Sequence, residues 1–453
     1  MIREGEITML LEVTESAQKK YEELAELDKK HFFHPSTSFR QQKADGPGFI
    51  FTEGKGIYLK DIRGREVIDS LSSLWNVNIG HGREELAIAA MEQMKKLAYS
   101  STFATNSHEP VIRLAAKIAE MAPGDLNYTF FTCGGSESND TAFKTARYYW
   151  KVKGYKNKTK IISRGKSYHG VSIGASPATG LFPFRDFPGL SQDHLYVDSS
   201  IEALKEMIER EGAETIAAII SEPVQGSGGV NLPPSQNFFK EVREICDQND
   251  ILFIADEVIN GFYRTGKNFG IDNFDVVPDM MAIAKGITSG YAPLGGVVFT
   301  DRLKEELTEL TEGNFYHGYT YSGHNTACAV ALKNLEIIEQ EKLNENVNLM
   351  GAELLKGFKY LEQTHEEIGN IRQIGLLGAI EIFKDRETKT TFEEPVSLKV
   401  VEEALKHNMI GRAIVYEGQD TIAFAPPFCI TKDEVEKVIS IIDTSLTAVK
   451  QRL

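Results

Sequence analysis

The amino-acid sequence predicts an α/β protein whose central sheet is mostly parallel. Its short apolar segments show no alternation of polar and apolar residues, a pattern typical of strands covered on both faces. Helical segments separate them, as in 236–249, where Phe239 and Val242 share one face with Ile245 and Cys246. No internal repeat or low-complexity linker interrupts the pattern. The predicted strands of this sheet are 128–132, 160–163, 215–220, 251–255, 280–284 and 296–299.

The two ends of the chain differ from this central pattern. Residues 14–31 are rich in charge and place apolar side chains at helical spacing, which predicts an amphipathic arm, and 49–70 resemble short strands. Mixed short strands return in the last hundred residues, with two amphipathic helices near 396–407 and 432–449. We therefore predict an N-terminal arm with part of a small domain (1–74), a large α/β domain (75–340) and the C-terminal part of the small domain (341–453).

Composition narrows the functional class. The 453 residues include 50 Lys and Arg against 65 Asp and Glu, and a net charge of −15 speaks against nucleic acid or anionic membrane as a partner. The four cysteines are scattered and form no CxxC pair, so neither a disulfide framework nor a zinc site is indicated. Charges alternate in Met1–Glu6, unlike a signal peptide, and no apolar run reaches the roughly 18 residues of a membrane span. These features favour a cytoplasmic enzyme.

The strand at 128–132 runs into two glycines, Gly134 and Gly135, and then into a helix that begins near Ser136. Free backbone N–H groups at the start of a helix, with a serine hydroxyl, form a phosphate cradle. The spacing matches neither a P-loop nor GxGxxG. An ordinary turn with Ser136 as the N-cap is the alternative.

Two charged residues follow apolar strands, where open α/β sheets bind their ligands. Asp256 ends one strand, and a buried carboxylate there needs a partner; Arg264 could pair with it. Its neighbour Glu257 could simply be solvated. Lys285 follows another strand, and a desolvated lysine becomes a nucleophile, although a surface lysine is the alternative.

An aromatic residue, Tyr168, follows the strand at 160–163 and could stack on a flat ligand, or belong to the core. A phosphate cradle, a stacking ring, a carboxylate and a lysine are together the parts that hold pyridoxal phosphate.

Two segments, Ile254–Gly266 and Pro278–Gly286, resemble the signature of the class III pyridoxal-phosphate-dependent aminotransferases, with Asp and Lys 29 positions apart in matching contexts. The resemblance extends from about Phe49 to the C-terminus. Within the family the chain is most similar to the ω-amino acid:pyruvate branch, through Trp75–Gly82 and His317–His324. The resemblance implies the fold-type I architecture and a homodimer with active sites at the interface, and leaves open whether dimers pair into tetramers.

The resemblance also implies a role for each matching residue. Lys285 would form the Schiff base with pyridoxal phosphate and then move the proton, and Asp256 would pair with the pyridine nitrogen. Tyr168 would stack on one face of the ring and Val258 on the other. The remaining implied residues are Gly135 and Ser136 at the phosphate, Thr320 from the partner subunit, Glu222 near the cofactor, and Trp75 and Phe103 in the substrate pocket, Phe103 from the partner chain.

Two positions concern the substrate. Arg412 resembles the mobile arginine that binds the carboxylate of pyruvate or an amino acid and swings away for an uncharged amine, with a surface arginine as the alternative. The segment after it, 415–418, is longer than the family pattern. Ser227 stands where ornithine- and acetylornithine-type relatives carry a glutamate that pairs with this arginine. This departure favours pyruvate as the acceptor.

We therefore expect an ω-aminotransferase that moves an amino group from a primary amine or ω-amino acid to pyruvate, by a ping-pong scheme that gives alanine and an aldehyde or ketone. The alternatives are a 2-oxoglutarate-dependent aminotransferase, an aminomutase, an epimerase or a dialkylglycine decarboxylase on the same fold. Two alternatives come from other functional classes: a nucleotide- or nicotinamide-dependent enzyme on an α/β sheet, and a non-enzymatic scaffold. The natural donor stays open, and no metal site or role for the histidines is expected.

Overall fold

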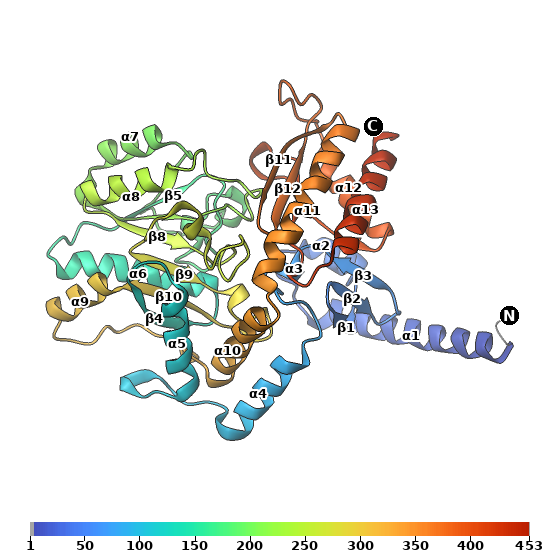
Figure 1. Cartoon of the computed structure of the whole chain (residues 1–453), viewed down its shortest axis with the longest axis horizontal. Coiled ribbons are helices and arrows are strands. Elements are labelled where there is room, and N and C mark those ends of the chain that lie inside the picture. Colours follow the sequence, from blue (N-terminus) through green and yellow to red (C-terminus); the bar gives the residue numbers. More distant parts are fainter. Residues whose placement is uncertain (1–3, 453) are drawn as a thin grey trace.

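The computed structural model describes residues 4–452, with side chains from residue 15 onward, so the ends of the predicted first and last segments, among them the start of the Met1–Glu6 stretch, lie outside the described residues. A seven-stranded sheet with the order β4-β10-β9-β8-β7-β5-β6 occupies the left of Figure 1. Its strands are β4 (Leu126–Thr132), β5 (Lys160–Arg164), β6 (His194–Val197), β7 (Ile216–Ser221), β8 (Leu252–Asp256), β9 (Met280–Ile283) and β10 (Gly295–Thr300).

Strands β5 to β9 pair in parallel, and only β10 runs antiparallel to its neighbours β4 and β9. Alternate residues of one strand enter different cores: Ile254 packs with α6, while Phe253 and Ala255 pack with α8 on the other face. Because both faces are covered, apolar runs without alternation are the expected pattern. The predicted mostly parallel α/β sheet is therefore confirmed, with β6 as a strand that the sequence did not reveal.

Helices cover this sheet and connect it to the rest of the chain (Figure 1). The amphipathic helices predicted at 236–249, 396–407 and 432–449 are all present within two residues of their predicted ends, and the predicted arm is part of a longer helix. The helices of the described part are α1 (Glu4–His31), α2 (Phe39–Asp45), α3 (Ser72–Trp75), α4 (Glu84–Leu97), α5 (Glu109–Met121), α6 (Gly135–Val152), α7 (Ile201–Glu211), α8 (Phe238–Gln248), α9 (Asp301–Leu310), α10 (Asn325–Gln340), α11 (Leu343–Thr364), α12 (Val396–Lys406) and α13 (Lys432–Lys450).

The N- and C-terminal segments lie side by side on the right of Figure 1, where β13 pairs in parallel with β3 through Ile68 and Met409. Two four-stranded sheets have the orders β1-β2-β3-β13 and β11-β12-β15-β14. The division into domains at 74/75 and 340/341 stays a prediction. The strands are β1 (Phe51–Lys55), β2 (Tyr58–Asp61), β3 (Glu66–Asp69), β11 (Ile368–Ile374), β12 (Leu377–Ile382), β13 (Met409–Ile410), β14 (Arg412–Ile414) and β15 (Thr421–Phe424).

A fully buried arginine, Arg264, ties the large sheet to both terminal segments. Its guanidinium donates to Asn78 Oδ1 at 2.6 Å and Ser72 Oγ at 3.1 Å, and to the carbonyl oxygens of Pro426 at 2.7 Å and Leu376 at 3.3 Å. A buried cation whose two terminal nitrogens donate to neutral oxygens from three segments fixes the relative positions of these segments. The alternative pairing of Arg264 with the carboxylate that ends β8 is therefore wrong.

None of the helices in the described range 4–452 carries an apolar stretch long enough to cross a bilayer. Nor do the described residues include a group of three or more His, Cys, Asp or Glu side chains placed to hold a metal ion.

Candidate active site

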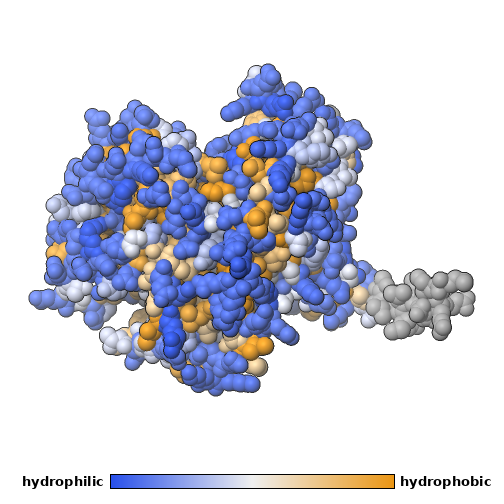
Figure 2. Space-filling view, viewed as in Figure 1, coloured by the Kyte–Doolittle hydropathy of each residue, from blue (hydrophilic) through white to orange (hydrophobic). Residues whose placement is uncertain are grey.

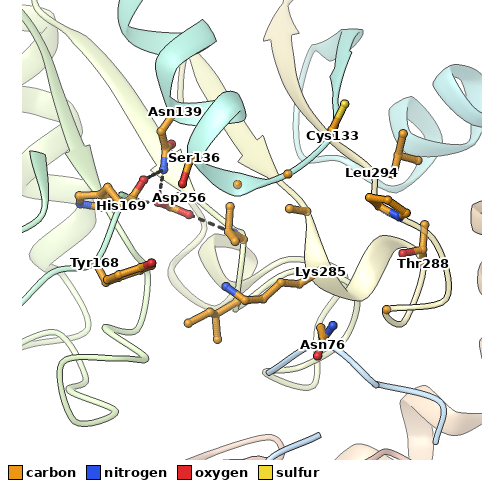
Figure 3. Close-up of a pocket in the computed structure, with 18 of the residues that line it drawn as sticks. Asn76, Cys133, Ser136, Asn139, Tyr168, His169, Asp256, Lys285, Thr288 and Leu294 are labelled. Atoms are coloured by element: carbon orange, nitrogen blue, oxygen red, sulfur yellow. Dashed lines mark hydrogen bonds and ion pairs between the residues drawn. The ribbon is translucent and has the colours of Figure 1, made fainter. Parts of the chain in front are cut away.

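A cavity of about 410 Å³ lies where the parallel strands of the seven-stranded sheet end (Figure 3). Its position agrees with the rule that open α/β sheets bind ligands beyond the carboxyl ends of their strands. The structure brings most of the predicted site residues together here. Those that line the cavity are Gly135, Ser136, Tyr168, Glu222, Asp256, Val258 and Lys285.

One wall of the cavity is the junction between β4 and α6. Gly134 is the N-cap residue, with no side-chain cap, so the alternative with Ser136 as N-cap is wrong. The Oγ of Ser136 accepts the N–H of Val171 at 3.2 Å, which leaves its own hydrogen free to be donated into the cavity. A Cβ at Gly135 would come within 2.8 Å of the Val258 side chain, so only glycine fits. Free N–H groups of a long helix and a hydroxyl donor suit a phosphate.

The carboxylate of Asp256 at the end of β8 is held by three donors and is only 2% exposed. His169 Nδ1 lies 2.7 Å and Asn139 Nδ2 lies 2.8 Å from Oδ2, and Val258 N–H donates to Oδ1 at 3.1 Å. Figure 3 shows the two side chains converging on the carboxylate. A buried carboxylate with this set of donors is oriented toward the cavity and can pair with a cationic ring nitrogen of a ligand.

Sequence reasoning missed His169 and Asn139, and it assigned the histidines of the motif loops to turns and packing. His169 directly follows Tyr168 and Asn139 lies in the first turns of α6. Both residues stood inside motifs that the sequence singled out. Only their three-dimensional proximity to Asp256, which lies 87 and 117 positions away, reveals the contact.

The carboxylate of Glu257, the residue after Asp256, is also buried rather than solvated. Glu257 is 0% exposed and accepts the backbone N–H groups of Gly270 and Ile271, both at 2.7 Å. Burial raises the pKa of Glu257 to about 8, and the two N–H donors oppose the rise. This residue caps a turn outside the cavity, so the alternative of a solvated Glu257 is wrong.

Lys285 follows β9 and its side chain crosses the cavity toward the side formed by Tyr168 and Asp256 (Figure 3). Its backbone adopts a φ of 47°, a left-handed conformation that costs a non-glycine residue energy. Burial lowers the pKa of the Lys285 amine, while the charges of Asp256 and Glu222 act in the opposite direction. A larger neutral fraction makes the amine a better nucleophile and base.

Glu222, at the end of β7, is 2% exposed and borders the same cavity. It accepts the N–H of Tyr168 at 2.9 Å and the N–H of Gly226 at 3.0 Å. Burial raises the pKa of Glu222 to about 7, helped by the charge of Asp256 and opposed by His169 and the two backbone donors. The carboxyl group therefore holds the backbone that carries the Tyr168 ring.

Four predicted substrate or partner residues lie outside the cavity. Trp75 is 4% exposed in a cluster with Val224 and Ile259, and its neighbour Asn76 lines the cavity instead. Arg412 lies on β14, close enough to Tyr168 to oppose the rise in the Tyr168 pKa that burial causes.

Phe103 and the loop that carries Thr320 lie together, outside the lining of the cavity. A Cβ at Gly318 would come within 2.7 Å of the Phe103 ring, and Tyr99 donates its hydroxyl to the Thr320 carbonyl at 2.7 Å. Neither Phe103 nor Thr320 reaches the cavity of its own chain.

These residues fit pyridoxal phosphate at each of its polar ends. The cradle at Gly135 and Ser136 suits the phosphate, Asp256 suits a protonated ring nitrogen, and the Lys285 amine suits the aldehyde. Fold and site together define a pyridoxal-phosphate-dependent enzyme of fold-type I. The chain belongs to the class III aminotransferases, because the family model "Aminotransferase class-III" matches residues 40–446.

Relatives with assigned reactions support this assignment over nearly the whole chain. The putrescine–pyruvate aminotransferase of Pseudomonas aeruginosa is 38% identical over 93% of this chain and 95% of its own. The diaminobutyrate–2-oxoglutarate transaminase of Halomonas elongata is 37% identical, covering 96% and 97%. The taurine–pyruvate aminotransferase of Bilophila wadsworthia is 34% identical, covering 95% and 98%.

Solved structures agree. A transaminase from the marine bacterium Virgibacillus superimposes with a TM-score of 0.93 at 49% identity, covering 95% of this chain and 99% of its own. An (S)-enantioselective ω-transaminase from Thermomicrobium roseum gives 0.88 at 41%, covering 94% and 98%. The ω-transaminase of Pseudomonas jessenii in complex with PMP gives 0.89 at 35%, also covering 94% and 98%. The enzyme is thus an aminotransferase that uses pyridoxal phosphate.

Proposed function

We propose that this enzyme is an ω-aminotransferase that transfers the amino group of a primary amine or ω-amino acid to pyruvate, giving alanine and an aldehyde or ketone. The observation that supports the proposal is the pair of positions 412 and 227, which lie outside the cavity lining. Arg412 lies near Tyr168, where its guanidinium would be available to bind a carboxylate, while position 227 holds a serine that cannot form an ion pair with it. Pyruvate brings one carboxylate, which one guanidinium binds.

Each residue of the cavity has its own role in the proposed reaction. Bound pyridoxal phosphate supplies a ring that stabilises the negative charge left when a C–H bond of the amine breaks. Lys285 would hold the cofactor through its amine, and the same amine would accept and return the proton, a task that its lowered pKa favours. Asp256 would keep the ring nitrogen protonated, and Tyr168 and Val258, which line the same cavity, would confine the ring.

Pyruvate and 2-oxoglutarate are distinguished by product analysis. A relative that is 37% identical carries the name of a 2-oxoglutarate transaminase, which makes this acceptor the second candidate. With 1-phenylethylamine, β-alanine, taurine or putrescine as the donor, we expect alanine from pyruvate in an amount equal to the carbonyl product. If glutamate forms from 2-oxoglutarate at an equal or higher rate, 2-oxoglutarate rather than pyruvate is the acceptor. If neither amino acid forms, the enzyme is a mutase, an epimerase or a decarboxylase.

Two variants test the roles of the charged residues. Lys285→Ala should abolish multiple turnovers, and retained turnover would remove this lysine from its proposed role. Arg412→Ala should raise the KM of pyruvate by about tenfold or more, since a charge-assisted hydrogen bond is lost, whereas the KM of an uncharged arylalkyl amine donor should change little. Equal changes for both substrates would place Arg412 outside the acceptor site.

We further propose a homodimer with shared active sites. An apolar surface, here named the α4 face, surrounds Phe103 and the loop of Thr320, and hydrophobic residues gather at the lower edge of Figure 2, where Figure 1 places α4 and α5. Exposed apolar area of this kind favours a protein partner. The α4 face consists of Ile88, Met91, Met94, Leu97, Tyr99, Phe103, Tyr316 and Tyr321, each at least 40% exposed.

Mixed dimers test this arrangement. Lys285→Ala subunits and Thr320→Asp subunits should each be inactive alone, because the first lacks the lysine and the second repels the phosphate of the neighbouring site. A mixture that exchanges subunits should regain activity, since one of its two sites combines both intact residues. Sedimentation as a monomer, or no recovery in a mixture shown to exchange, would contradict shared sites.

A cytoplasmic location completes the proposal. All four cysteines are free thiols in the described structure, which suits a reducing compartment. A fluorescent fusion should distribute through the cytoplasm, and its appearance in an exported fraction would contradict this location.

A further inference from the structure

A short glycine-rich segment lies between the large sheet and the C-terminal sheet. We name residues 226–229, which follow Glu222 after a turn, the glycine loop. Two side chains from the C-terminal part of the chain donate hydrogen bonds to its carbonyl oxygens. Gln419 Nε2 donates to the carbonyl oxygen of Gly228 at 2.6 Å, and Arg372 donates to that of Gly229 through Nε at 3.1 Å and Nη2 at 2.9 Å. The two parts of the molecule are thus fastened to one another beside the active site.

Both donors are themselves held in place. Arg372 on β11 is 7% exposed and pairs with Glu381 on the neighbouring strand β12. Gln419 precedes β15, is 5% exposed, and accepts the side-chain amide of Asn231 at 3.3 Å. A buried bidentate guanidinium has little freedom to follow a shifted carbonyl, so the position of the C-terminal sheet dictates that of the glycine loop.

The loop has no room to adjust by itself. A Cβ at Gly228 would collide with the carbonyl oxygen of Lys166, and Gly229 has a φ of 112°, which residues other than glycine adopt at a cost. The same close approach brings the loop against the segment that leads from β5 to Tyr168. A displacement of the loop therefore presses directly on that segment.

From the loop, hydrogen bonds continue to the cavity. The N–H of Gly226 donates to one carboxyl oxygen of Glu222 at 3.0 Å, and the other oxygen accepts the N–H of Tyr168 at 2.9 Å. The Tyr168 ring lines the cavity. A continuous, buried series of contacts thus connects Arg372 and Gln419 with the ring that borders the cofactor position.

We propose that Arg372 and Gln419 are positioning residues: through the glycine loop and Glu222 they fix the Tyr168 ring, and so set the affinity of the site for pyridoxal phosphate. Neither residue lines the cavity. This role requires that the chain binds pyridoxal phosphate, but it is independent of which amine and which keto acid react.

The affinity of the apoprotein for pyridoxal phosphate measures the effect directly. The full-length protein is freed of cofactor and titrated with pyridoxal phosphate while its absorbance is followed. Arg372→Met and Gln419→Met should each raise the Kd about tenfold, as is typical of contacts that act through a network, while Arg372→Lys, which keeps one donor, should recover part of the loss. Arg452→Met is a control for the loss of an arginine from the same part of the chain, because it breaks an exposed ion pair with Glu403 without touching the loop.

A double-mutant cycle separates positioning from general loss of structure. In the Tyr168→Ala background there is no ring to misplace, so Arg372→Met should change the Kd by less than about twofold. Two results would overturn the proposal: a Kd within twofold of the parent for both Arg372→Met and Gln419→Met, or an equal loss with and without the Tyr168 ring. If Arg372→Met does not fold, the same cycle is run with Gln419→Met, a neutral substitution of similar size. Failure of the parent protein to bind pyridoxal phosphate at all would instead refute the cofactor assignment.

Discussion

The contact between His169 and Asp256 predicts that a ring without hydrogen-bonding nitrogens at position 169 will weaken catalysis while leaving the fold intact. We consider His169→Phe, which keeps a planar aromatic ring but is somewhat larger than histidine; the control variant, His194→Phe, carries the same increase in size. The histidine side chain is fully buried, and its Nδ1 lies 2.7 Å from Asp256 Oδ2, whereas its Nε2 has no hydrogen-bond partner among the described residues. The substitution therefore removes one useful hydrogen bond and also removes an unsatisfied nitrogen.

The magnitude follows from the kind of bond that is lost. A hydrogen bond to a charged group contributes about 1.5–3 kcal/mol, and about 1.4 kcal/mol corresponds to a factor of ten. Two donors, Asn139 and Val258, remain on the carboxylate, so Asp256 stays in place but pairs less firmly with the ring nitrogen of the cofactor. We expect kcat/KM to fall roughly 10- to 150-fold at saturating cofactor.

The assay is the formation of alanine from pyruvate and an amine, with the Kd of pyridoxal phosphate measured alongside. His194→Phe is the control: His194 is also buried, lies against Phe143, and has neither ring nitrogen bonded within the described structure. It should retain its activity. If His169→Phe loses less than twofold, or no more than His194→Phe, the contact with Asp256 does not serve the reaction.

Two further predictions concern stability and one concerns the cofactor. Burial raises the pKa of Glu222 from 4.5 to about 7, so its carboxyl group stabilises the fold at low pH, and this stability is lost as the pH rises through about 7. Glu222→Gln should remove that dependence, worth about 3 kcal/mol between pH 4 and 9, and urea unfolding curves that keep the same pH slope would contradict it. Arg264→Met leaves four buried acceptors without their donor and should lower the free energy of unfolding in urea by roughly 3–5 kcal/mol. An unchanged urea midpoint would show that the hydrogen bonds of Arg264 do not stabilise the fold. Ser136→Ala removes the hydroxyl that Val171 orients and should raise the Kd of pyridoxal phosphate about tenfold but leave that of pyridoxal unchanged, whereas equal changes would place the phosphate elsewhere.

The sequence predicted most of the sheet because its strands are buried on both faces. Apolar runs such as 251–255 are compatible with few structures besides a covered strand, and the residues that follow them meet at one edge of a parallel sheet whatever the details of packing. Strand β6 escaped notice because His194–Val197 is short and has a polar residue at its start. Local pattern is informative where burial is complete along a strand or where apolar residues follow a helical period, and a short strand with mixed residues offers neither.

The contacts inside the site were less accessible to sequence reasoning. That Asp256 would need a partner followed from its position, but which of several candidates reaches it depends on the path of two loops. From the sequence, Arg264 was as reasonable a partner for Asp256 as His169. In the structure, however, the Arg264 guanidinium donates to the carbonyl oxygen of Pro426 instead. Trp75 shows the same limit, because the structure buries its side chain in the core and leaves Asn76 at the cavity.

The pairing of β3 with β13 has a consequence for how the chain folds during synthesis. Ser70 and Ile410, which bond across this junction, are 340 positions apart. At about 5–20 residues per second, the ribosome needs roughly 17–70 s to deliver the second partner after the first has emerged. Throughout that interval the edge of β3 is unpaired, a state in which strands join the wrong neighbours. The nascent chain should therefore depend on chaperones that shield its first strands until the last hundred residues arrive.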